Sequence, residues 1–169
     1  MTREQKIVGV GAASGVVSMA LGMWLLSRAL PTPQVNGAGE RIAYALQWDV
    51  LAVLPLVLMI GAIGNARFGN EAIDPTRGAE TRAMVINGRV ADNTLQQFVL
   101  YFTGSLALAT LLPAERLGIV GAAAITFFVS RMLFWIGYRI DPLYRAFGFA
   151  STFYLNLGLL LGAAWLAPT

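Results

Sequence analysis

Long apolar segments alternate with short polar ones along the whole chain. The apolar segments are long enough for helices that cross roughly 30 Å of hydrocarbon, which takes about 20 residues. They predict helices over about residues 7–30, 45–67, 81–112, 117–138 and 147–166. We therefore expect an all-α fold, a polytopic membrane bundle of five transmembrane helices, with an ordered polar loop before the third helix.

The predicted third helix differs from the others because its first half is polar. Its polar positions on one face are Arg82, Arg89, Asn93 and Gln96. Steps of seven, four and three residues return to nearly the same direction on an α-helix, so these side chains form one stripe. Charged groups are costly to place in a bilayer, and therefore the stripe is a candidate functional site.

The composition supports a membrane protein and excludes several kinds of chemistry. Hydrophobic residues make up 57% of the chain and charged residues 12%, whereas soluble domains carry about 25% charge. At 169 residues the chain is predicted to form one integral membrane domain. Without cysteine or histidine, it offers no thiol nucleophile or histidine-ligated metal site of its own. The basic residues are dispersed, which argues against nucleic-acid binding.

The distribution of basic residues predicts the orientation in the membrane. With five spans, one side of the bilayer carries Arg3, Lys6, Arg67, Arg77, Arg82, Arg89, Arg139 and Arg145. The other side carries only Arg28, Arg41 and Arg116. The positive-inside rule places the N-terminus in the cytoplasm. The first apolar segment is longer than that of a signal peptide and predicts an uncleaved transmembrane helix. A short chain with no targeting peptide fits a bacterial inner-membrane protein. Asp49, at the edge of the second helix, is expected to stay hydrated.

Two further groups of polar residues lie near the same predicted membrane face. Arg131 and Tyr138 are seven residues apart on one face of the fourth helix, and Pro142 and Arg145 follow that helix. Guanidinium groups bind carboxylates, and a guanidinium or a phenol hydroxyl also holds a bound thiol as its thiolate. These residues favour an anionic ligand with an apolar tail or an apolar co-substrate.

The residues from Arg89 to Gln96 read Arg-Val-x-x-Asn-x-x-Gln, which resembles the Arg-Ala-x-x-Asn-x-x-Glu signature of the MAPEG family. These are the membrane-associated proteins in eicosanoid and glutathione metabolism. Arg131 and Tyr138 resemble the family's arginine and tyrosine on its third helix. Arg145 lies where the family's leukotriene synthases place the arginine that activates the thiol of glutathione.

The resemblance covers about residues 49–167 and implies a four-helix core over 45–169, preceded by an additional helix and loop over 1–44. It implies a homotrimer surrounded by membrane lipids, with ligand sites between subunits. The start of the third helix would face the end of a neighbouring subunit's fourth helix. The family assigns glutathione binding to the positions of Arg89, Asn93, Gln96, Arg131 and Tyr138. A lipophilic electrophile would enter from the bilayer and react with the thiolate.

Three positions depart from the family pattern and motivate a second hypothesis. Gln96 replaces the glutamate, Gln97 follows where some members have tyrosine, and Phe134 lacks the hydroxyl of the corresponding tyrosine. A degenerate member of the family would serve as a structural or accessory subunit of a larger membrane complex. A transporter or channel is a weaker alternative, because the chain has no obvious charged pair in mid-membrane.

Each candidate residue also has an ordinary interpretation in a membrane helix. Arg82 and Arg89 would extend towards lipid phosphates. Asn93, like both glutamines, would bond to or pack against a neighbouring helix. Tyr138 would belong to the aromatic belt at the membrane interface. The sequence leaves these interpretations open beside the glutathione site.

Overall fold

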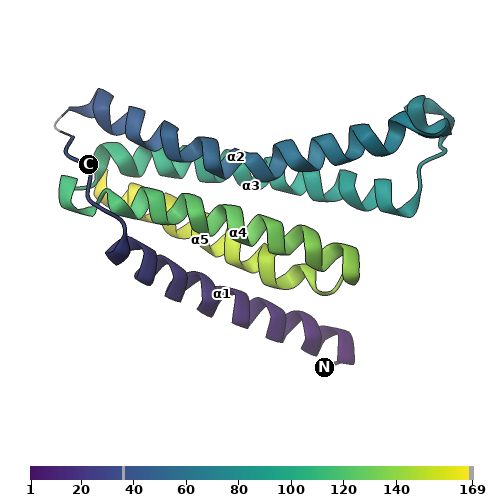
Figure 1. Cartoon of the computed structure of the whole chain (residues 1–169). Coiled ribbons are helices and arrows are strands. Elements are labelled where there is room, and N and C mark those ends of the chain that lie inside the picture. Colours follow the sequence, from purple (N-terminus) through teal and green to yellow (C-terminus); the bar gives the residue numbers. More distant parts are fainter. Residues whose placement is uncertain (36, 168–169) are drawn as a thin grey trace.

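The computed structural model describes residues 1–35 and 37–167, and most of them are helical. The elements are α1 (Arg3–Ala29), α2 (Ala38–Phe68), the 3-10 helices η1 (Glu71–Ile73) and η2 (Pro75–Arg77), α3 (Arg82–Leu111), the 3-10 helix η3 (Ala114–Arg116), α4 (Gly118–Ile140) and α5 (Arg145–Leu166). Figure 1 shows the long helices running side by side, with the two termini at opposite ends of the bundle. The predicted all-α fold is confirmed.

Four of these helices are long and apolar enough to cross a membrane: α1, α2, α4 with its preceding 3-10 turn, and α5. The 30 residues of α3 make it as long as the others, but its polar side chains keep it outside this group. It nevertheless packs against α2, α4 and α5 within the bundle. The chain is therefore an integral, multi-pass membrane protein, and the polar helix lies among its apolar ones.

The start of α2 lies earlier than the apolar pattern predicts, at Ala38 rather than near residue 45. The helix continues into polar sequence because its first turns have a partner at the end of α3. The Arg41 guanidinium donates a hydrogen bond to the backbone carbonyl of Leu112, the C-cap residue of α3. Carbonyls at a helix C-terminus lack intrahelical donors, so this contact stabilises both helix ends.

The early start of α2 explains why the predicted hydration of Asp49 is wrong. Asp49 lies about three turns inside the helix and is buried against α3. The Ser105 hydroxyl oxygen is 3.0 and 3.2 Å from its two carboxylate oxygens. A buried carboxylate needs such donors, because protein atoms replace the water that would otherwise solvate it.

Replacing Ser105 by alanine is expected to lower the free energy of unfolding by about 1–3 kcal/mol, since the Asp49 carboxylate loses its hydroxyl donor. The matched control is Thr103→Ala, because the exposed Thr103 hydroxyl bonds only the Val99 carbonyl of its own helix. Denaturant unfolding of both variants in detergent measures the difference. Equal losses in the two variants would contradict a role for the buried contact.

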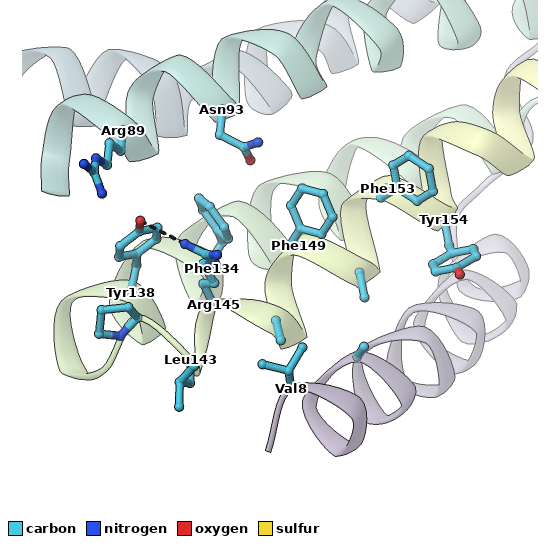
Figure 2. A pocket seen from close by; sticks show the side chains of 14 residues that line it. Val8, Arg89, Asn93, Phe134, Tyr138, Leu143, Arg145, Phe149, Phe153 and Tyr154 are labelled. Atoms are coloured by element: carbon cyan, nitrogen blue, oxygen red, sulfur yellow. Dashed lines mark hydrogen bonds between the residues drawn. The ribbon is translucent and has the colours of Figure 1, made fainter. Parts of the chain in front are cut away.

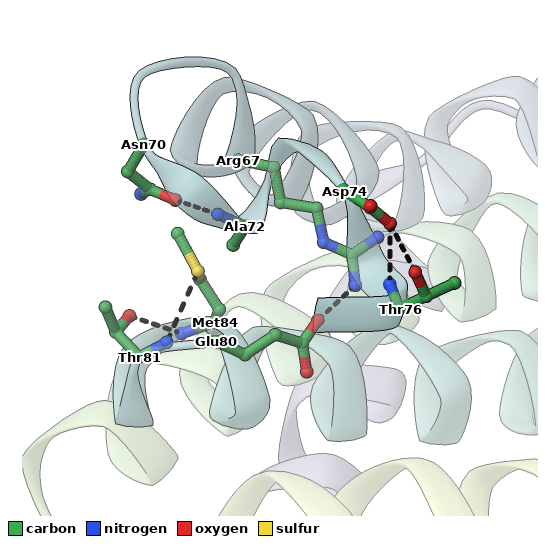
Figure 3. Close-up of polar contacts among 8 residues, drawn as sticks. All are labelled: Arg67, Asn70, Ala72, Asp74, Thr76, Glu80, Thr81 and Met84. Carbon is green, nitrogen blue, oxygen red and sulfur yellow. Dashed lines mark hydrogen bonds and ion pairs between the residues drawn. The ribbon is translucent and has the colours of Figure 1, made fainter. Parts of the chain in front are cut away.

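The connection between α2 and α3 is an ordered loop, as predicted (Figure 3). Asn70 and Asp74 accept backbone hydrogen bonds at the starts of η1 and η2, and Arg67 and Glu80 form an ion pair across the loop. The hydroxyl and backbone N–H of Thr76 lower the pKa of the Asp74 carboxyl by bonding its charged form. This end of α2 and α3 extends beyond the turn between α4 and α5 (Figure 1).

The added helix α1 is attached closely to α5. A Cβ atom at Gly15 would overlap the carbonyl oxygen of Phe147, so only glycine allows this approach of the two backbones. The Ser151 hydroxyl of α5 donates to the Gly15 carbonyl across 2.9 Å. One turn earlier, Gly11 also packs against α5, where a Cβ atom would lie 3.4 Å from the Cβ atom of Ala146. Small residues and a polar contact are the usual means of packing helices tightly in a membrane.

Candidate functional site

A cavity of about 680 Å³ lies where α1, α3, α4 and α5 meet (Figure 2). Its polar wall contains Arg89 and Asn93 from α3, Tyr138 from α4 and Arg145 at the start of α5. Each of these residues is a sequence-predicted site residue. Pro142, from the turn before α5, lines the same cavity. The structure therefore brings four of the six predicted residues together within a single chain.

The turn between α4 and α5 positions Arg145 against Tyr138. The Asp141 carboxylate accepts the backbone N–H of Leu143 at 2.8 Å, which tightens the turn. Arg145 then donates a hydrogen bond of 3.0 Å to the Tyr138 hydroxyl, and its guanidinium carbon lies 5.1 Å from the centre of that ring. The N-terminus of α5 adds partial positive charge to this end of the cavity.

Arg131 lies behind the cavity wall rather than in it. Its side chain is fully buried, and its guanidinium carbon is 3.9 Å from the centre of the Phe134 ring. One terminal nitrogen lies 3.2 Å from both the Asn93 side-chain oxygen and the Thr152 hydroxyl. Arg131 therefore connects α4 with α3 and α5, and it fixes the orientation of Asn93 at the cavity.

The two glutamines of α3 have different surroundings. Gln97 is buried and accepts two hydrogen bonds from the Asn156 amide, so its predicted packing between helices is confirmed. Gln96 is exposed and lines neither of the described cavities. Arg82 lines a smaller neighbouring cavity of about 380 Å³, together with Arg139. Tyr138 borders both cavities.

The residues of the apolar wall of the larger cavity were not predicted from the sequence. It contains Phe149, Phe153 and Tyr154 from α5, and Val8 and Ala12 from α1. The rings of Phe149 and Phe153 are nearly parallel, with centres 6.0 Å apart. Their spacing of four residues was visible in the sequence, whereas the contribution of α1 depends on how α1 packs against α5.

The cavity separates cationic and hydrogen-bonding groups at one end from aromatic and aliphatic groups at the other. Within the described residues, neither Arg89 nor Arg145 forms an ion pair with an acidic side chain. Both guanidinium groups are therefore available to an anionic ligand. The described part of the chain contains no group of three acidic, histidine or cysteine residues that could hold a metal ion. The arrangement is suited to an amphiphilic ligand or to an anionic ligand beside an apolar one.

The sequence model of the MAPEG family matches residues 45–165. Two relatives are named Transmembrane protein 79. The one from Bos taurus is 30% identical over 129 residues, which cover 76% of this chain and 32% of the relative. The one from Mus musculus is 28% identical over 129 residues, covering 76% and 33%. The chain thus spans about a third of the length of these relatives. No solved structure matches the chain significantly.

Proposed function

Because the chain belongs to the MAPEG family, we propose that it binds glutathione and acts as a transferase or peroxidase on lipophilic electrophiles. The observation that carries this proposal is the gathering of Arg89, Asn93, Tyr138 and Arg145 around one cavity with an aromatic wall. The polar end suits the charged tripeptide, and the apolar end suits a substrate that arrives from the membrane.

The proposed roles follow from the geometry of the polar wall. Arg89 would hold a carboxylate of glutathione through charge-assisted hydrogen bonds, while Asn93, oriented by Arg131, would bond its peptide groups. Arg145 would stabilise the thiolate, with the Tyr138 hydroxyl beside it. Glutathione itself supplies the sulfur nucleophile, so the absence of cysteine and histidine from the chain is compatible with this chemistry.

A homotrimer with cytoplasmic N-termini is part of the same proposal. Gln96 and Asp92 are exposed on the outer face of α3, where polar side chains facing lipid would be costly. A neighbouring subunit would cover this face, and Gln96 would then reach the ligand from the adjacent protomer or bond across the interface. The concentration of basic residues at one end of the bundle supports the cytoplasmic orientation.

Calorimetry of glutathione binding to the detergent-purified protein tests the proposal. We expect Arg89→Ala and Arg145→Ala each to weaken binding by about tenfold or more, because a hydrogen bond to a charged group contributes about 1.5–3 kcal/mol. Arg116→Ala is the matched control, since Arg116 lies in η3, between α3 and α4 and outside both cavities. No binding to a well-folded wild-type protein, or equal weakening in all three variants, would overturn the proposal.

An accessory role in a larger membrane complex is the second candidate function. It is favoured by the exposed position of Gln96 outside the cavity and by the apolar outer face of α1, where Val10, Val17 and Leu21 are exposed. The name of the two relatives states a location and no reaction. Stable co-purification with another membrane protein, lost on deletion of residues 1–30, would favour this function over catalysis.

A further inference from the structure

We propose that α1 selects the lipophilic substrate, because it forms one wall of the apolar half of the cavity. The inference rests on the proposed function and deepens it by naming the substrate class. The cavity takes an elongated apolar group, such as an acyl chain, that lies along the surface formed by α1 and α5. Val8 and Ala12 are the α1 residues that determine the width available to it.

The position of α1 is fixed firmly enough for this role. Val8, Gly11, Ala12 and Gly15 recur at intervals of three, one and three residues, so they lie on one face of the helix. The two glycines on this face pack against the α5 backbone. Val8 and Ala12 lie on the same face and border the cavity. The close contact that holds α1 on α5 therefore also sets the distance of this wall from the aromatic residues of α5.

The shape of the apolar half indicates an elongated ligand. On α5 the cavity is lined from Arg145 to Tyr154, nine residues along the helix, which corresponds to about 14 Å. Phe149 and Phe153 stack in parallel between these two positions. Figure 2 shows Val8 on α1 and Arg89 on α3 at opposite sides of the cavity. Arg89 and the α1 wall thus line different sides of the cavity.

The α1 wall lies outside the region that the family model matches, since that region begins at residue 45. The polar wall, from Arg89 to Arg145, lies inside it. The residues proposed to hold glutathione therefore belong to the shared family core, whereas the α1 wall is a feature of this chain added to that core. The two proposed roles therefore involve different residues, and they can be tested by different variants.

Photolabelling in lipid nanodiscs tests the role of α1 directly. The probe is a 16-carbon fatty alcohol with a diazirine at mid-chain, and its adducts are mapped by mass spectrometry. Labelling of residues 145–154 is measured relative to labelling of the lipid-facing α2. We expect Val8→Trp and Ala12→Trp to reduce this ratio at least fivefold, because the indole occupies the part of the cavity that borders α1. Val10→Trp is the control, since Val10 is 70% exposed and lies outside the cavity.

Glutathione binding is measured on the same preparations and is expected to be unchanged in Val10→Trp, since Val10 lies outside the cavity. Wild-type labelling at residues 145–154 that persists in Val8→Trp and Ala12→Trp would overturn the role of α1. An equal reduction in Val10→Trp, or no labelling of this segment in the wild type, would also overturn it. If wild-type protein fails to bind glutathione, the proposed function fails, but the labelling ratios still report whether α1 forms the wall.

Discussion

Replacing Gly148 by leucine is expected to prevent α4 and α5 from packing, and to yield an unstable or aggregated protein. A Cβ atom at this position would lie 2.5 Å from the backbone nitrogen of Phe134 and 2.6 Å from the carbonyl oxygen of Ser130. Both neighbours are backbone atoms, which cannot rotate away as a side chain can. Overpacking of a core typically costs about 1–3 kcal/mol, and this rigid contact places the cost at or above the upper end.

Gly158→Leu is the matched control for this prediction. Gly158 also lies in α5, but a Cβ atom there would meet no atom within 4 Å. The two variants share the change in helix propensity and hydrophobicity and differ in the packing contact. Size-exclusion profiles and thermal unfolding in detergent compare them. Similar profiles for Gly148→Leu and Gly158→Leu would show that the close approach of α4 and α5 is not required for folding.

Arg131→Met is expected to unfold at a similar or higher temperature than the wild type, while Arg131→Ala is less stable than Arg131→Met by about 2–5 kcal/mol. Arg131 is fully buried, and two of its guanidinium nitrogens have no hydrogen-bond partner among the described residues. An unpaired buried charge is costly, so an apolar side chain of similar length removes that cost. Alanine leaves a cavity instead.

The same methionine variant is expected to bind glutathione more weakly, because Asn93 loses the donor that orients it. Thermal unfolding and calorimetry on one preparation therefore separate stability from function. A large loss of stability in Arg131→Met would show that the buried arginine stabilises the folded protein. Retained stability with weaker binding would instead identify Arg131 as a positioning residue for the ligand site.

The helical organisation could be predicted from the sequence because membrane helices depend on long apolar segments. The predicted limits of α3 and α4 differ from the observed ones by one or two residues, whereas α2 begins well before its apolar part. That extension depends on Arg41 reaching the end of α3, a contact between positions 71 residues apart. The hydration of Asp49 was predicted wrongly for the same reason, since its distance from the helix end was underestimated.

The polar half of the cavity was predictable, and its apolar half was not. Arg89, Asn93, Tyr138 and Arg145 were recognisable because charged and hydrogen-bonding groups are rare in membrane helices and therefore informative. Val8 and Phe149 are ordinary residues for a membrane helix, and only the packing of α1 against α5 shows that they share a cavity. The helical period placed Gln96 in the same stripe as Arg89, but it could not show which part of the stripe faces the neighbouring helices.

The Asn156 amide donates hydrogen bonds to both the backbone and the side-chain oxygen of Gln97. These two bonds set the position of α3 relative to α5. They fix how far α3 is rotated and how far it has slid along its neighbour. Asn93 and Arg89 lie one and two helical turns before Gln97. Both side chains therefore face the cavity because the bonds from Asn156 fix the rotation of α3. An inserted residue between Arg89 and Gln97 would turn the arginine by about 100°, whereas the loop before α3 can change length without moving the site.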